Sequence, residues 1–335
     1  MKNAVVTGGA GFIGSHLADE LSRRGYQLTI LDDLSVGKKG NIEALLARTA
    51  EGGNVRFFQD SVTNLSVLFS LFRHVDYVFH LAAIASVPKS IQDPLTSHQV
   101  NVTGSLNVLM AAKTMKVRKV IFISSSAVYG DTPTLPQSEE TLPAPQSPYA
   151  VTKLAGENYC RVFQDVYHLN TVGLRYFNVY GPRQDPNSQY AAVIPKFIST
   201  ILEGKAPAIF GSGEQTRDFV FVRDAVAAAI LAAESDATGV YNVGVGNAVT
   251  INELVHLILR AAGKNDLKPV YKESRSGDIL HSLADISRAK TFGYNPKYSL
   301  EEGLRETIRY FSGHASSDIK RTRAISGRSQ ETLPN

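Results

Sequence analysis

Apolar residues in the first half of the chain alternate between short runs typical of buried strands and longer stretches with helical spacing. The short runs predict strands at 3–7, 27–31, 54–59, 75–80, 118–123 and 171–176. Helical spacing between them predicts helices at 12–24, 64–73, 95–114 and 147–168. Because strand and helix alternate, we expect an α/β fold with a parallel, doubly wound sheet that helices cover on both faces.

After about residue 178 the alternation weakens, and Gly and Pro become more frequent. Further helices are predicted at 190–203, 250–262 and 299–312. We expect residues 1–178 to form the main domain and residues 179–312 to form a smaller C-terminal α/β lobe. The segment 222–243 has a helical and then a strand pattern, so we expect it to rejoin the main sheet. The polar stretch 313–335 lacks periodicity and predicts a disordered tail.

A glycine-rich turn follows the first predicted strand and precedes the first predicted helix. Its glycines stand at positions 8, 11 and 14. Gly8 permits a tight turn, Gly11 lets the backbone approach a pyrophosphate, and Gly14 lets the helix pack closely on the strand. The N-terminus of that helix offers free N–H groups and the positive end of a dipole to phosphates. The turn therefore predicts a dinucleotide-binding site.

Two acidic residues at strand ends bear on the identity of the dinucleotide. Asp32 ends the second strand, where a carboxylate can accept both ribose hydroxyls of an adenosine and repels a 2′-phosphate. This favours NAD over NADP, although a solvated loop acid is the alternative role for Asp32. Asp60 closes the third strand, and we expect it to accept a hydrogen bond from the adenine amino group.

A tyrosine and a lysine four residues apart form a second candidate for chemistry. Tyr149 and Lys153 lie in the predicted helix 147–168, so their side chains share one face. A free tyrosine has a pKa of about 10 and is a poor base at neutral pH. A neighbouring lysine cation and an oxidised nicotinamide favour the phenolate and lower that pKa. The pair can then remove a proton from a substrate hydroxyl while a hydride leaves the same carbon.

Three serines, Ser124 to Ser126, follow the predicted strand 118–123. Small hydroxyl residues at the carboxyl end of a parallel strand point into the cleft where ligands bind. Ser125 can pass a proton or donate a hydrogen bond to an alkoxide. Serine clusters are also frequent in ordinary loops, so this feature gains meaning only beside the other two.

Four features occur in this order along the chain: the glycine turn, Asp32 at a strand end, the serine-rich strand end and Tyr149-x-x-x-Lys153. Together they resemble the extended short-chain dehydrogenase/reductase superfamily over about residues 2–312. Within it, the chain resembles the UDP-sugar 4-epimerases. Further matching segments are His80-Leu81-Ala82-Ala83, Asn101-Val102-Thr103-Gly104, Leu174-Arg175-Tyr176-Phe177-Asn178, Thr216-Arg217-Asp218-Phe219 and Arg275-Ser276-Gly277-Asp278. The resemblance implies a Rossmann-type NAD domain with a small lobe for the nucleotide sugar.

The resemblance also implies roles for individual residues. Ser125, Tyr149 and Lys153 take the catalytic roles. The implied cofactor site consists of Gly8, Gly11, Phe12, Ile13, Asp32, Asp60, Leu81, Ala82, Ala83, Tyr149, Lys153 and Tyr176. The implied substrate site consists of Ser86, Ser125, Ser126, Asn178, Val193, Phe210, Arg217, Arg275, Asp278 and Ser282. In it, Asn178, Arg217 and Arg275 contact the diphosphate, Phe210 lines the uracil pocket and Asp278 holds the uridine ribose. Arginines suit this task because a diphosphate needs permanently charged, bidentate donors.

Three positions separate the possible reactions and substrates. Sugar-nucleotide 4,6-dehydratases carry Asp-Glu where this chain has Ser126 and Ala127, and UDP-glucuronate decarboxylases keep a glutamate at the second place. Epimerases restricted to UDP-glucose and UDP-galactose carry a bulky tyrosine where this chain has Ser282, which leaves space for a 2-acetamido group. The sequence thus favours NAD-dependent, reversible C4 epimerisation of UDP-hexoses through a 4-keto intermediate, N-acetylated sugars included. A glucose-only epimerase, a dehydratase or decarboxylase, and a non-catalytic NAD-binding scaffold remain as alternatives.

Composition and charge indicate the cellular compartment of the protein and the classes of partner that it is expected to lack. Apolar residues make up 43% of the chain and charged residues 20%, as in ordinary soluble proteins. No apolar run is long enough to cross a bilayer, and the first strand begins too early for a signal peptide. A single cysteine, Cys160, suits a reducing compartment, so we expect a cytoplasmic protein. The net charge of +4 predicts no nucleic-acid or membrane partner, and the histidine spacing predicts no metal site. By resemblance, the helices at 95–114 and 147–168 form a homodimer interface.

Overall fold

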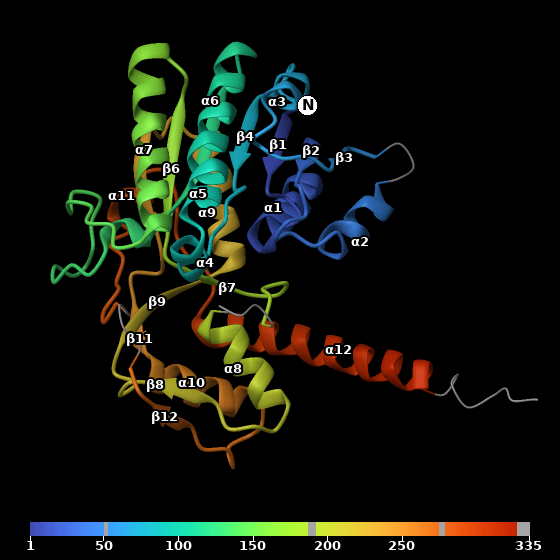
Figure 1. Ribbon diagram of the computed structural model, residues 1–335, viewed down its shortest axis with the longest axis vertical. Helices are drawn as coiled ribbons and strands as arrows, with labels where there is room; N and C mark the ends of the chain where they lie inside the picture. Colours follow the sequence, from blue (N-terminus) through green and yellow to red (C-terminus); the bar gives the residue numbers. More distant parts are fainter. Residues whose placement is uncertain (50–52, 187–191, 275–278, 327–335) are drawn as a thin grey trace, which may run out of the picture.

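The computed structural model describes residues 1–49, 53–186, 192–274 and 279–326, and gives the backbone alone for 314–326 (Figure 1). Its main sheet has seven strands in the order β10-β6-β5-β4-β1-β2-β3, and every neighbouring pair is parallel. The strands are β1 (Asn3–Thr7), β2 (Gln27–Leu31), β3 (Val55–Phe58), β4 (Tyr77–His80), β5 (Lys119–Ser125), β6 (Thr171–Tyr176) and β10 (Gly239–Val243). All six strands predicted in the first half of the chain are present, and the expected α/β fold is confirmed.

Helices cover both faces of this sheet because successive strand residues, which point to opposite faces, are both apolar. On one face Val5, Val120 and Phe122 pack in one apolar core with the helices α3 (Leu65–Leu71), α6 (Gly104–Thr114) and α7 (Pro148–Tyr167). On the other face Val6 and Ile121 pack in a second core with α1 (Phe12–Arg23), α2 (Gly40–Arg48) and α9 (Val222–Glu234). The pattern did not predict α2, because only Ile42 and Leu45 are buried in it.

The helix predicted at 95–114 is divided in the structure. It consists of α5 (Pro94–His98), a π-helical turn η1 (Gln99–Thr103) and α6. The wider turn carries Asn101, whose side chain bonds the backbone N–H of Ile84 at 2.8 Å and the Thr152 hydroxyl at 3.0 Å. Such single turns recur at functional sites, and hydrophobic spacing does not reveal them, because the apolar stripe continues on either side. A further short helix, α4 (Val87–Gln92), precedes α5 and was not predicted.

The C-terminal lobe lies below the main sheet in Figure 1. It contains a three-stranded sheet in the order β11-β9-β7 and a pair of strands, β12 and β8. Its strands are β7 (Asn178–Tyr180), β8 (Ala208–Phe210), β9 (Thr216–Phe221), β11 (Ala248–Thr250) and β12 (Val270–Lys272). Its helices are α8 (Val193–Leu202), α10 (Ile251–Ala261), α11 (Ser287–Lys290) and α12 (Leu300–Ser326). Between these elements the chain returns to the main domain through α9 and β10, the latter beside β6.

The end of the chain differs from the sequence-based expectation. Residues 313–335 were expected to be a disordered tail, but α12 continues to Ser326. The segment 314–326 contains neither Gly nor Pro, so nothing in it interrupts the helical hydrogen bonds, although it lacks apolar periodicity. Residues 327–335 lie outside the described part of the chain. None of the described helices is both long and apolar enough to span a membrane.

The glycine turn between β1 and α1 is packed so closely that side chains do not fit. Gly8 has φ of +71°, and its N–H donates to the Leu31 carbonyl at 2.8 Å. A Cβ on Gly14 would lie 2.1 Å from the Gly8 carbonyl oxygen, which is backbone and cannot move aside easily. The start of α1 therefore rests directly on the end of β1, as predicted for this glycine.

We expect Gly14→Ala to lower the free energy of unfolding by about 1–3 kcal/mol, because the methyl group overpacks this turn. Chemical denaturation would measure the difference. Gly40→Ala is the matched control, because a Cβ at this helical glycine meets no heavy atom within 4 Å. Equal stability of the two variants would contradict the close packing of the turn.

Candidate active site

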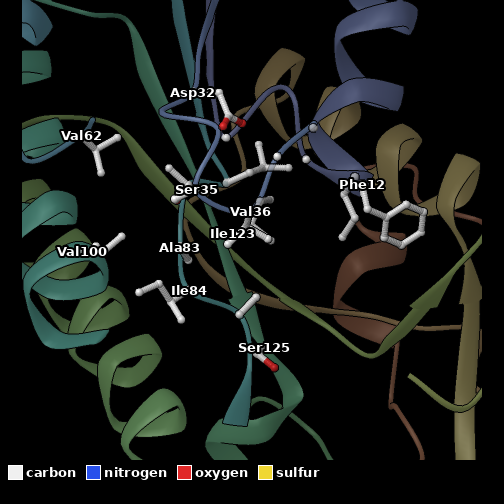
Figure 2. Close-up of a pocket in the computed structure, with 18 of the residues that line it drawn as sticks. Phe12, Asp32, Ser35, Val36, Val62, Ala83, Ile84, Val100, Ile123 and Ser125 are labelled. Carbon is white, nitrogen blue, oxygen red and sulfur yellow. The ribbon is translucent and has the colours of Figure 1, made fainter. Parts of the chain in front are cut away.

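An elongated pocket runs along the carboxyl ends of the main strands, where ligands of open α/β sheets bind. Figure 2 shows Asp32 towards one end of it and Ser125 towards the other. The structure brings all the residues of the predicted cofactor site into the walls of this pocket: Gly8, Gly11, Phe12, Ile13, Asp32, Asp60, Leu81, Ala82, Ala83, Tyr149, Lys153 and Tyr176. Their contact with NAD itself stays a prediction.

The N-terminus of α1 opens onto this pocket through the glycine turn. Gly11 is its N-cap, and no side chain caps the helix there. The first N–H groups of a helix need an acceptor, and the helix dipole favours a negative one. Gly11 and Phe12 line the pocket at this point. A pyrophosphate is suited to this position.

Asp32 has a structural role in addition to its predicted one. Its carboxylate accepts the backbone N–H of Ala10 and that of Leu34, each at 2.9 Å, so it joins the glycine turn to the loop after β2. The side chain is 7% exposed, and burial raises the pKa of this carboxyl while the backbone hydrogen bonds oppose the rise. Asp60 likewise bonds locally, to the backbone N–H of Ser61 at 2.7 Å and to the amide of Asn64.

The start of α7 is held firmly, which fixes the predicted catalytic pair. Ser147 caps the helix by accepting the N–H of Ala150 at 3.2 Å, and the Tyr149 N–H donates to the Ser90 hydroxyl at 3.0 Å. Tyr149 and Lys153 lie one helical turn apart and both line the pocket, as their spacing predicted. The Lys153 ammonium donates to the Ile123 carbonyl at 2.8 Å, which ties α7 to the end of β5 beside Ser125.

Burial dominates the protonation of this pair. It raises the pKa of Tyr149, and the nearby Ser125 hydroxyl acts in the other direction. Burial also lowers the pKa of Lys153 to about 8, while the Glu157 carboxylate raises it in part. The sequence-based expectation of a lowered tyrosine pKa included an oxidised nicotinamide and stays a prediction, whereas in the protein alone burial outweighs the lowering effect of Ser125. That expectation considered the charge of Lys153, whose ammonium nitrogen lies 5.9 Å from the centre of the Tyr149 ring. It did not consider that burial removes water from the phenol.

His80 supports the pocket wall and is not a reacting group. Its ring nitrogens bond the hydroxyls of Thr7 and Ser105, each at 2.8 Å. Burial lowers the pKa of His80 to about 3, and the Lys153 charge adds to the effect, so the ring stays neutral. The histidine thereby anchors the strand end that carries Leu81. The described residues contain no group of three His, Cys, Asp or Glu side chains suited to a metal ion.

A second pocket in the C-terminal lobe adjoins the first, because Val179 and Gln184 line both. Four residues of the predicted substrate site lie in its walls: Asn178, Val193, Phe210 and Arg217. The Arg217 guanidinium donates to the Thr216 carbonyl at 2.8 Å, which steadies it beside the pocket. The arrangement places a permanent cation and an aromatic ring next to the cofactor pocket.

Ser125 lines the first pocket, and the remaining predicted substrate residues lie elsewhere. Ser86 caps α4 by accepting the N–H of Lys89 at 3.3 Å, and Ser126 begins the short helix η2 (Ser126–Tyr129) directly after Ser125. Ser282 is buried, and its N–H donates to the Thr216 carbonyl at 3.2 Å, one residue before Arg217. None of the three lines either pocket. Arg275 and Asp278 lie outside the described residues.

Two buried side chains hold the segment that carries Ser282. Asp218, on β9, accepts the N–H of Ala284 at 3.2 Å and those of Val245 and Gly246 at 2.8 and 2.9 Å. Burial raises the pKa of this carboxyl to about 6. Asn242, on β10, donates to the Asp285 carbonyl at 3.1 Å. The segment is thus fixed both to the strand that carries Arg217 and to the main sheet.

Sequence reasoning did not identify several residues of the cofactor pocket. They belong mainly to the loop after β2 and to the ends of β3 and β4: Asp33, Ser35, Val36, Gly37, Ser61, Val62, Ile84, Val100 and Gln184. Most carry no distinctive chemistry, and only Gly37 offered a signal. A Cβ there would lie 2.7 Å from both Asp32 oxygens, so a glycine was needed near that acid.

Three solved structures resemble this chain closely, and each covers 93% of it and 99% of the other chain. A UDP-N-acetylglucosamine 4-epimerase from Methanobrevibacter ruminantium M1, in complex with UDP-N-acetylmuramic acid, has a TM-score of 0.89 and 46% sequence identity. A UDP-glucose 4-epimerase from Thermotoga maritima with UDP-glucose has a TM-score of 0.88 and 40% identity. A UDP-glucose 4-epimerase from Thermus thermophilus, in complex with NAD, has a TM-score of 0.83 and 37% identity.

Sequence comparison gives a consistent picture. A UDP-glucose 4-epimerase from Mycolicibacterium smegmatis is 38% identical over 92% of this chain and 97% of its own length. A UDP-N-acetyl-alpha-D-glucosaminuronate decarboxylase from Bacillus cytotoxicus is 36% identical over 92% and 98%. The NAD dependent epimerase/dehydratase family matches residues 4–244. The chain therefore belongs to this NAD-dependent family and is an enzyme of the UDP-sugar 4-epimerase kind.

Proposed function

We propose that the protein reversibly inverts C4 of UDP-hexoses through a 4-keto intermediate, and that it accepts UDP-N-acetylglucosamine and UDP-N-acetylgalactosamine as well as UDP-glucose and UDP-galactose. One observation carries the proposal. Ser125, Tyr149 and Lys153 line the predicted cofactor pocket, and the pocket that contains Arg217 adjoins it. A nucleotide sugar that spans both pockets brings its sugar to the catalytic residues and its diphosphate to the arginine.

The residues of the first pocket suit one proton transfer at the sugar. In the proposed reaction the Tyr149 phenolate takes the proton of the O4 hydroxyl, and Ser125 donates a hydrogen bond to the same oxygen. The C4–H bond breaks with its electron pair, and a C4 carbonyl forms. When bound, NAD supplies the reversible hydride acceptor, so no cofactor is consumed over the cycle. The glycine turn and Asp32 would hold it.

Lys153 supplies the positive charge that this proton transfer needs. Because burial raises the pKa of Tyr149, proton loss from the phenol requires a nearby cation. The pKa of Lys153 is about 8, so the ammonium is mostly charged at neutral pH. Its bond to the Ile123 carbonyl keeps it on the pocket side of α7. We expect activity to decline as the pH rises above this value.

Inversion requires that the keto sugar present its other face before the hydride returns. The second pocket suits this step, because Arg217 and Phe210 can hold the uridine diphosphate while the sugar turns about it. Return of the hydride to the opposite face of C4, with the proton from Tyr149, then gives the epimer. Val179 and Gln184 line both pockets, so the two pockets adjoin at these residues.

Two observations support this reaction over its alternatives. Ser126 and Ala127 follow Ser125, so the carboxylates that an elimination needs are absent from these two positions. The similarity to a decarboxylase at 36% identity keeps that reaction as an outcome to be tested. Tyr149 and Lys153 are both present in the pocket, which favours an enzyme over an NAD-binding scaffold.

The product of one incubation separates these reactions. We expect purified protein given UDP-N-acetylglucosamine and NAD to form UDP-N-acetylgalactosamine, detected by proton NMR. A keto-deoxy sugar would instead indicate a dehydratase, and no turnover of any UDP-sugar a scaffold. UDP-glucuronate is the companion substrate, because release of carbon dioxide from it would indicate a decarboxylase. We also expect NAD to stay bound through purification.

Exposed apolar side chains support a homodimer as part of the proposal. Val151, Val162 and Val166 lie on one face of α7 and are 52%, 44% and 60% exposed. Figure 1 shows α6 beside α7, and Met110 on α6 is also exposed. Such a face can pair with its own copy around a two-fold axis.

Replacement of Tyr149 by Phe tests the proposed base. We expect kcat to fall by about 100-fold or more, because the ring remains but no group can take the O4 proton. The affinity for UDP should change by less than about threefold, since UDP binds in the other pocket. Tyr167→Phe, at an exposed tyrosine on the same helix, is the control. Full activity of the Tyr149 variant would exclude the assignment.

Replacement of Ser282 by Tyr tests the sugar specificity that the family resemblance implies for this position, although Ser282 itself is buried and lines neither pocket. The larger side chain should abolish turnover of UDP-N-acetylglucosamine while turnover of UDP-glucose stays within about threefold. Ser282→Ala serves as the control, because it removes the hydroxyl without filling space. An unchanged ratio of kcat/KM for the two sugars would rule out a role of this position in sugar selection.

Replacement of Val162 by Asp tests the dimer. A charge on an apolar contact surface should convert the dimer to monomer, because it cannot be buried unpaired. Analytical ultracentrifugation would measure the change in mass. Val270→Asp, at a similarly exposed valine on β12, should leave the mass unchanged. A wild-type protein that is already monomeric would refute the interface.

A further inference from the structure

A carboxylate that the proposed mechanism does not use lies behind the catalytic residues. Glu157 stands four residues after Lys153 on α7, and its side chain is 4% exposed. It accepts three hydrogen bonds, from the Ser124 hydroxyl at 2.5 Å and from Nε and Nη2 of Arg175 at 2.9 and 2.7 Å. Both oxygens are thus engaged, and the pairing with the guanidinium is bidentate.

The two partners of Glu157 lie next to Ser125 and Tyr176, and Ser124 itself also lines the cofactor pocket. Ser124 precedes Ser125 at the end of β5, and Arg175 precedes Tyr176 at the end of β6. The two strands pair in register, with Ser124 opposite Arg175 and Ser125 opposite Tyr176. One carboxylate on α7 therefore ties together two adjacent strand ends. A shift of either end would move Ser125 relative to Tyr149.

The same carboxylate is the acidic group that acts on Lys153. The groups that face this buried ammonium are Tyr149 and Glu157 on α7 and His80 on β4. His80 is neutral, so its contribution to the charge is small. Arg175 on β6 lies beyond Glu157 and is charged, and its guanidinium also lies 4.7 Å from the Tyr129 ring centre. Without Glu157, the buried ammonium would lose the carboxylate that favours its charged form.

Resting on the proposed epimerase function, we propose that Glu157 is a positioning residue for the reaction. Through Ser124 it fixes the strand end that carries Ser125, and through its charge it keeps Lys153 an ammonium beside Tyr149. It touches neither the cofactor pocket nor the substrate pocket and acts through these neighbours. Apolar replacement of both partners of a buried ion pair is often neutral for stability, so the presence of this pair does not by itself indicate a stabilising role.

The charge-removing variant Glu157→Gln has two expected effects. The amide keeps the shape of the side chain, so KM for the UDP-sugar should stay within about threefold of the wild type. The alkaline limb of the kcat profile should move to lower pH by about one unit, because Lys153 then loses its proton more readily. Stopped assays of epimer formation between pH 6 and pH 10 would give both quantities.

Two further variants separate positioning from stability. Glu157→Gln leaves the Arg175 charge buried without its partner, and this can unfold the protein. The double variant Glu157→Gln, Arg175→Gln avoids the problem because it removes both charges. This pair should fold and still show the moved limb. Ser124→Ala removes one hydrogen bond but keeps the charge, so kcat should fall by about threefold or more with the limb unmoved.

Asp224→Asn is the matched control. Asp224 is also a buried carboxylate, and it accepts the backbone N–H groups of Lys297 and Tyr298 at 2.9 and 3.1 Å, away from the pocket. The Asp224→Asn variant should have a lower thermal stability than the wild type and the same pH profile of kcat. If the Glu157 variants behave like this control, with lower stability and a superimposable profile, the inference is overturned. If Ser124→Ala has the kcat of the wild type, the inference that Glu157 positions the end of β5 through Ser124 is overturned. Absence of any epimer from the wild type would instead refute the proposed function.

Discussion

Burial of the main sheet on both faces is the constraint on which the rest of the structure depends. Neighbouring residues such as Val5 and Val6 each pack in a separate apolar core, so neither face of the sheet is open to a ligand. The carboxyl ends of the parallel strands are the edge that remains accessible for polar chemistry. The glycine turn, Asp32 and Ser125 come from three different strands and meet at this edge.

The same burial determines the electrostatics of the site. Groups that reach the strand ends from within the fold lose water, and the loss disfavours their charged forms. In the protein alone, burial favours the neutral forms of Tyr149 and His80 and lowers the pKa of Lys153 to about 8. The Glu157–Arg175 pair stays charged, because the carboxylate and the guanidinium pair through two short hydrogen bonds. A single carboxylate can therefore influence both the geometry and the charge of the reacting groups.

A chain of buried polar contacts connects this region to the C-terminal lobe. Arg175 lies over the Tyr129 ring, and the Tyr129 hydroxyl donates to Asn242 at 2.7 Å. Asn242 in turn donates to the carbonyls of Gln137 and Asp285, at 2.9 and 3.1 Å. Because β10 carries Asn242 and belongs to the main sheet, the return of the chain to that sheet positions the segment with Ser282. The contact between the two lobes thus has a defined structural basis.

The sequence by itself determined the fold class, the six strands of the first half and the residues of the glycine turn, because hydrophobic spacing and glycine reflect local backbone requirements. It also determined that Tyr149 and Lys153 share a face, since helical geometry alone decides this. Two features were out of reach of local patterns. The π-turn at Gln99–Thr103 leaves the apolar stripe intact, and α12 continues to Ser326 through residues without periodicity.

Only the tertiary structure decided how these residues behave chemically. The pKa values of Tyr149 and Lys153 depend on how much water the surrounding elements exclude, and no spacing along the chain reports that exclusion. The partnership of Ser124, Glu157 and Arg175 joins residues up to 51 positions apart, on two strands and a helix. Such contacts arise from the packing of those elements in three dimensions, so they became visible only in the folded molecule.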